Sequence, residues 1–164
     1  MKALDPGTKA PNVELPLLGG GKFSLTESLS KGSVLLAFFK ISCPVCQYAL
    51  PYIDRLSRRV SGKGLKVIGV SQDDAKATDI FRKEYGVSFP IALDELGKYP
   101  VSNAYGLTNV PTLFLVGEDG KIEQTIVSWS KAELEEIDHA YRDSHHAAKP
   151  LFAPSEQVAD FRAG

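Results

Sequence analysis

The chain has 164 residues, of which 43% are hydrophobic and 24% charged, and its formal net charge is -1. This length predicts one domain that buries about two-thirds of its unfolded surface. A net charge close to zero gives no electrostatic reason to expect nucleic acid or an anionic membrane as a partner. No run approaches the ~20 apolar residues that a membrane span needs, so we expect no spanning segment.

The N-terminal stretch Met1 to Pro6 lacks the apolar core of a secretory signal. This favours a cytoplasmic protein. An exported protein whose leader had been removed would look the same, so a periplasmic location stays open.

The residue pattern predicts alternating strands and helices. In chain order we expect strands over 13–18 and 22–25, a helical turn over 26–29, a strand over 34–40, a helix over about 44–60, a strand over 66–71, a helix over 75–85, a strand over 89–93, a short helix over 98–105, strands over 112–116 and 121–128, and a helix over 131–143. Gly19-Gly20-Gly21 predicts a hairpin turn. Asp73 or Asp74, and later Ser130, are expected helix caps, whereas Pro100 weakens the short helix.

The most informative stretch is the apolar run from Val34, which ends at Cys43-Pro44-Val45-Cys46. Such a run reads as a strand buried on both faces. A thiol in the first turn of the following helix faces unpaired N–H groups and the positive end of the helix dipole, so we expect a reactive thiolate there. The second thiol lies on the same helical face and can close a disulfide with the first.

Two other interpretations of the cysteine pair are weaker. A zinc site needs a second pair of ligands, and His139, His145 and His146 lie far away in sequence, so we expect no metal. Two inert core cysteines are the other alternative. Burial alone explains neither the proline between the cysteines nor the helix start, and a Cys-x-x-Cys pair beside a βαβ pattern is typical of a redox motif.

The strand, the Cys-x-x-Cys turn and the helix together resemble the thioredoxin superfamily. Pro51 matches the proline that kinks the active-site helix of thioredoxins, and Val110-Pro111-Thr112 resembles the family's cis-proline strand. The inserted segment between the two motifs is similar to the branch that holds membrane-associated thiol–disulfide reductases and alkyl hydroperoxide reductase/thiol-specific antioxidant proteins. The resemblance implies an α/β thioredoxin fold, with a central mixed sheet flanked by helices, an N-terminal β-hairpin and a βα insertion.

The resemblance also implies roles for individual residues. Cys43 would attack a substrate disulfide and Cys46 would resolve the mixed disulfide, with no metal or organic cofactor. Pro111 would be cis, and Val110 before it would present its backbone to an incoming peptide. Pro44 and Val45 would contact substrate and tune the redox poise of the pair. A trans proline at the start of an edge strand is the alternative for Pro111.

Residues near the cysteine pair are expected to affect its chemistry or its packing. Lys40 would stabilise the thiolate if its ammonium reached the sulfur, although a solvated lysine is favoured. Ser42 stands where typical thioredoxins carry tryptophan, and Ala37 stands where they carry a buried acid that moves protons. Proton transfer to Cys46 therefore needs water or another group. The single tryptophan, Trp129, is expected to serve packing.

We expect a thioredoxin-like domain over residues 1–146 and a C-terminal tail over 147–164, whose apolar residues favour docking over disorder. The leading function is thiol–disulfide exchange, with protein or small-molecule disulfides and an upstream thiol reductant as partners. A peroxiredoxin-type peroxidase is the first alternative, yet Lys40 occupies the position of the threonine or serine that such enzymes use. A non-catalytic redox sensor is the second.

Overall fold

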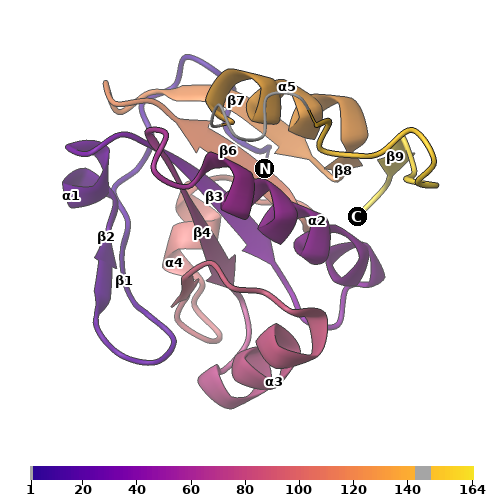
Figure 1. Ribbon diagram of the computed structural model, residues 1–164. Coiled ribbons are helices and arrows are strands. Elements are labelled where there is room, and N and C mark those ends of the chain that lie inside the picture. The colour runs from indigo at the N-terminus through magenta and orange to yellow at the C-terminus, as the bar shows by residue number, and fades with distance from the viewer. Residues whose placement is uncertain (1, 143–148) are drawn as a thin grey trace.

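The computed structural model describes residues 2–142 and 149–164, and its centre is a five-stranded mixed sheet in the order β5-β4-β3-β6-β7 (Figure 1). The strands of this sheet are β3 Ser33–Phe39, β4 Leu65–Ser71, β5 Ile91–Leu93, β6 Thr112–Val116 and β7 Ile122–Val127. This is the α/β thioredoxin fold that the sequence predicts.

The central strand, β3, is buried at every position because both faces of the sheet are covered. It pairs in parallel with β4 and antiparallel with β6, so it ends beside the start of β6. Side chains of β3 alternate between two apolar clusters. Leu35, Ala37 and Phe39 belong to one cluster, and Leu36 and Phe38 lie among the residues of the other. The alternation follows from the two-residue period of a strand.

Helices cover both faces of the sheet, as Figure 1 shows with α2 in front and α4 behind. The first cluster lies under α2 Pro44–Val60, α3 Ala75–Tyr85 and α5 Lys131–Tyr141, and the second lies under α1 Leu25–Leu29 and α4 Pro100–Ala104. None of the helices described here is long and apolar enough to cross a membrane.

The predicted helix caps and the hairpin are confirmed. Asp74 caps α3 by accepting from the Ala77 N–H, and Ser130 caps α5 in the same way through Glu133. Pro100 occupies the first turn of α4, where its missing N–H costs nothing, so it begins the helix rather than weakening it. The hairpin consists of β1 Glu14–Pro16 and β2 Lys22–Ser24, and its three glycines all have positive φ.

The tail packs against the body over residues 149–164, as the sequence favoured. Leu151 and Phe152 are buried in the first cluster, whereas Phe161 is 62% exposed. A short antiparallel pair, β8 Trp129–Ser130 with β9 Phe161–Arg162, joins the tail to the start of α5. The predicted domain boundary at 146/147 lies outside the described residues, and the division into domain and tail stays a prediction.

Candidate active site

Cys43 lies where β3 has ended and α2 begins, and it is the N-cap of that helix. Its sulfur accepts a hydrogen bond from the Cys46 N–H at 3.4 Å. Pro44 follows in the first turn, where proline is favoured because its fixed φ suits a helix start. The sulfur of Cys43 is therefore held against the positive end of a 17-residue helix, as the sequence predicts.

The second part of the site comes from the loop before β6. The Val110–Pro111 peptide bond is cis, which confirms the prediction drawn from the resemblance. The thiol of Cys43 donates a hydrogen bond to the Val110 carbonyl oxygen at 3.4 Å. A hydrogen bond across the loop holds its two ends together: the buried Thr112 hydroxyl donates to the Asn109 carbonyl at 2.8 Å.

Cys43 and Cys46 are both free thiols in different environments. Cys43 is half-buried, whereas Cys46 is fully buried in the first apolar cluster. Burial strongly raises the pKa of the Cys46 thiol, and the neighbouring Cys43 and Asp73 raise it further, while a backbone hydrogen bond at Lys40 lowers it. Cys46 is thus a protonated thiol at neutral pH, and only the half-buried Cys43 is accessible to a substrate.

Asp73 is a residue of the site whose position the sequence did not reveal. It follows β4, and its carboxylate accepts a hydrogen bond from the Ile41 N–H at 2.8 Å. Asp73 therefore braces the loop that leads to Cys43, and its charge acts on Cys46. The adjacent pair Asp73-Asp74 suggested a helix cap. Asp74 is that cap, which leaves Asp73 free to turn toward the redox loop.

The other predicted site residues differ in how far they are exposed to solvent. Pro44 is exposed beside Cys43, and Val45 packs partly against the first apolar cluster. Lys40 and Ser42 lie in the loop that leads to Cys43. Both are exposed, so their side chains face solvent. Pro51 lies inside α2, which continues through it to Val60.

Trp129 is 2% exposed, in keeping with the packing role expected for it. It contacts the rings of Tyr48, Tyr52 and Phe152, and its indole N–H donates to the Ala159 carbonyl at 2.7 Å. Tyr48 and Tyr52 project from α2 one and two turns after the cysteine pair. The aromatic cluster thus links the redox helix to the tail.

Ala37, at the position of the missing acid, is buried in β3 opposite Leu113. Within residues 2–142 and 149–164, no three His, Cys, Asp or Glu side chains come together as a metal site. His145 and His146 lie outside the described residues.

The sequence profile of the AhpC/TSA family matches residues 6–125. Thiol-disulfide oxidoreductase ResA of Bacillus thuringiensis subsp. konkukian is 36% identical over 138 residues, covering 81% of this chain and 76% of ResA. ResA of Bacillus subtilis strain 168 is 30% identical over 126 residues, covering 76% and 69%.

Solved structures agree with these relatives. A Chlorobium tepidum protein assigned as thiol:disulfide interchange protein DsbE superposes with a TM-score of 0.74 at 27% identity, covering 84% of this chain and 95% of its own. Peroxidoxin BcpB of Mycobacterium tuberculosis has a TM-score of 0.71 at 20% identity over 87% and 100% of the chains, and this shows the shared fold alone.

The relatives and the Cys43–Cys46 pair make thiol–disulfide exchange the chemistry of this chain. The chain belongs to the AhpC/TSA family, in the redoxin branch of the thioredoxin superfamily.

Proposed function

We propose that the chain exchanges its Cys43–Cys46 dithiol with disulfides in protein substrates. The Cys43 thiolate attacks one substrate sulfur, the substrate S–S bond breaks, and the released substrate thiolate takes a proton. Cys46 then loses its proton and attacks the Cys43 sulfur, which frees the second substrate thiol. The substrate is reduced by two electrons, the Cys43–Cys46 pair becomes a disulfide, and an upstream thiol reductant restores the dithiol.

The observation that carries this proposal is the asymmetry between the two sulfurs. Cys43 is half-buried and is held at the helix start by the Cys46 N–H, whereas Cys46 is fully buried directly behind it. Attack on a substrate needs access, and resolution needs a second thiol within reach of the first. A backbone donor at the Cys43 sulfur stabilises the thiolate that attacks and later leaves.

The substrate is proposed to dock beside Val110 and Pro111. The Val110 carbonyl already faces the Cys43 sulfur, so a peptide bound along this loop would bring its own disulfide to the nucleophile. Pro44, which is exposed next to Cys43, and the partly buried Val45 are proposed to line the adjoining rim of the site. Extended peptides commonly bind to exposed backbone in this way, with main-chain groups giving affinity and side chains giving selectivity.

Turnover of two substrates tests the proposal. The reduced protein is assayed with insulin, a protein disulfide, and in parallel with hydrogen peroxide, alongside Cys43→Ser and Cys46→Ser. We expect insulin reduction that both variants lose, and negligible peroxide consumption. Rapid peroxide consumption instead would make the chain a peroxidase and contradict the proposal. Absence of turnover with either substrate would favour the sensor interpretation.

A cytoplasmic location is a separate prediction. Fractionation of cells that produce the protein tests it, and recovery in the periplasmic fraction would overturn it.

A further inference from the structure

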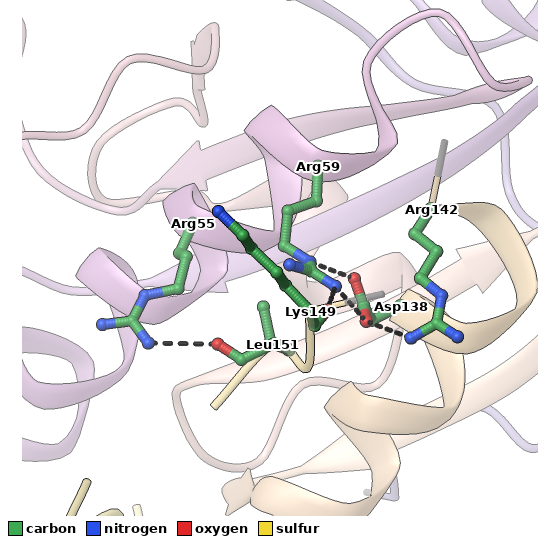
Figure 2. Close-up of polar contacts among 6 residues, drawn as sticks. All are labelled: Arg55, Arg59, Asp138, Arg142, Lys149 and Leu151. Atoms are coloured by element: carbon green, nitrogen blue, oxygen red, sulfur yellow. Dashed lines mark hydrogen bonds and ion pairs between the residues drawn. The ribbon is translucent and has the colours of Figure 1, made fainter. Parts of the chain in front are cut away.

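The tail is anchored to the redox helix by a set of polar contacts (Figure 2). Arg59 of α2 makes two hydrogen bonds to the carboxylate of Asp138 on α5, at 2.6 and 3.0 Å, and a third to the Lys149 carbonyl at 2.6 Å. One turn earlier, Arg55 donates to the Leu151 carbonyl at 3.1 Å and pairs with Glu156. Residues 149–160, here called the anchor, are therefore fixed to α2.

Apolar contacts hold the anchor as well. Leu151 and Phe152 are 4% and 5% exposed, and Phe152 packs against Tyr52 and Trp129. The last part of the anchor reaches the start of α2, where the Ala159 N–H donates to the Tyr48 hydroxyl at 2.9 Å. The anchor therefore ends close to the cysteine pair. Figure 1 shows the C-terminal end of the chain beside the first turns of α2.

Residues 161–164, here called the tip, continue along the redox site itself. Phe161 and Arg162 pair with β8, and the guanidinium of Arg162 lies 4.1 Å from the centre of the Tyr48 ring. The Gly164 N–H then donates to the Ser128 hydroxyl at 3.0 Å. Ser128 in turn donates its own N–H to the Pro111 carbonyl at 2.9 Å, so the tip runs beside the cis-proline loop.

Gly164 touches the carbonyl group that faces Cys43. A side chain on Gly164 would clash with the Val110 oxygen, and its Cβ would also lie 3.3 Å from a Pro111 ring carbon. Only a residue without a side chain therefore fits there in this conformation. The Val110 oxygen thus has the Cys43 thiol as one neighbour and Gly164 as another.

We propose that the tip occupies the peptide-docking edge of the redox site, and that an extended disulfide-containing polypeptide binds by displacing it. The inference rests on the proposed function, because the edge matters only if protein disulfides dock beside Val110. Its partner class is a polypeptide long enough to replace the tip along Trp129, Ser128 and Val110. A small disulfide needs only Cys43 and leaves the tip in place.

The distribution of contacts supports movement of the tip alone. The four tip residues are all exposed, whereas the anchor contains buried apolar side chains and two arginine contacts. Segments with few buried contacts open at low free energy while the remainder stays folded. An occupied edge lowers the apparent affinity for substrate in proportion to the fraction of molecules whose edge is free.

The test uses the full chain with substitutions that weaken the tip. Gly164→Ala introduces the clash with the Val110 carbonyl, and Arg162→Ala removes the guanidinium that packs on the Tyr48 ring. Each is expected to raise kcat/KM for insulin by about fivefold, the effect of losing one weak contact that holds the tip. The rate at which iodoacetamide alkylates Cys43 should change far less, because this reagent is small. Ala163→Ser, at an exposed tip residue, is the matched control and should behave like the unsubstituted protein.

A second readout does not depend on turnover. Trp129 is the single tryptophan and pairs with Arg162 of the tip, so release of the tip should increase quenching of its fluorescence by acrylamide. The same increase is expected when the Cys43 thiolate of Cys46→Ser attacks a disulfide of intact insulin and remains trapped as the mixed disulfide, and not when it reacts with oxidised glutathione to carry a glutathione adduct.

The outcomes separate the two proposals. If the unsubstituted protein reduces insulin and both tip variants match it in rate and quenching, the edge is not blocked and the inference about the tip fails alone. Slower insulin reduction by the variants, with alkylation unchanged, would mean that the tip assists docking and would also overturn it. If the unsubstituted protein reduces no disulfide, the proposed function fails and the inference fails with it.

Discussion

The Cys43 sulfur lies 3.4 Å from the carbonyl oxygen of Val110, a residue 67 positions further along the chain. The contact exists because β3 and β6 are antiparallel neighbours, so the end of one meets the start of the other. The nucleophile and the backbone group proposed to receive the substrate are thus placed by a single strand pairing. The geometry of the loop between Asn109 and Thr112 should then determine how well a substrate reaches the sulfur.

Thr112→Val tests the role of that loop. The variant keeps the shape of the side chain and removes the hydroxyl that donates to the Asn109 carbonyl. Loss of one such hydrogen bond costs about 1 kcal/mol, so we expect KM for insulin to rise about fivefold with little change in kcat. Thr112→Ser should restore the value. An equal fall in kcat and in the alkylation rate of Cys43 would instead indicate damage to the redox centre.

The burial of Cys46 predicts how stability depends on pH. Its pKa is raised above the ordinary value of 9.0, so above that pH the folded reduced protein retains a proton that the unfolded chain has lost. The free energy of unfolding should therefore fall as pH rises beyond about 9. Urea unfolding of the reduced protein and of Cys46→Ala at pH 7 to 10 measures this. The pKa of Tyr105 is also raised by burial, and since both proteins contain it, its effect cancels in the difference. Parallel curves would contradict the prediction.

The sequence predicted those parts of the fold that depend on local signals. The apolar run before Cys43, the glycine that ends α3 and the cap residues Asp74 and Ser130 each act within a few residues of their own position. The cysteine pair was found in the same way, because the residues that begin the helix and place a thiol in its first turn are adjacent in the sequence. The family resemblance supplied the strand order and the cis bond at Pro111, which periodicity alone does not determine.

The contacts that escaped prediction join residues far apart in sequence. Asp73 braces the loop at Ile41 across 32 positions, and Arg59 meets Asp138 across 79. An isolated Arg or Asp gives no sign of a distant partner, because surface and buried charges look alike in sequence. The tail was expected to dock through its apolar residues. Its path to Val110 depends on backbone contacts of Gly164, which leave no trace in composition.

The ion pair between Arg59 and Asp138 predicts a strong dependence of stability on Arg59. Their side chains are 8% and 3% exposed, so removal of Arg59 takes two short hydrogen bonds from a buried carboxylate and leaves it the more distant Arg142, at 3.8 Å. Arg59→Met should lower the free energy of unfolding by about 3–5 kcal/mol. Arg59→Met combined with Asp138→Leu should recover much of that loss, because an apolar pair needs no desolvation of charge. Urea unfolding of the single and double variants measures these free energies. Additive losses of stability in the double variant would show that the two residues act independently.

Asp73 provides the most specific test of how Cys46 is tuned. Asp73→Asn keeps an oxygen that can accept from the Ile41 N–H and removes the negative charge that raises the pKa of Cys46. The pKa of Cys46 should fall slightly, since Asp73 contributes less than burial and less than Cys43. In a Cys43→Ser background, alkylation of Cys46 at alkaline pH should then become faster, with its pH profile moved to lower pH.

Asp74→Asn is the matched control, because asparagine caps a helix about as well as aspartate and Asp74 faces solvent. If both substitutions leave the profile unchanged, water and the buried surroundings set the protonation of Cys46, and Asp73 serves only to hold the loop.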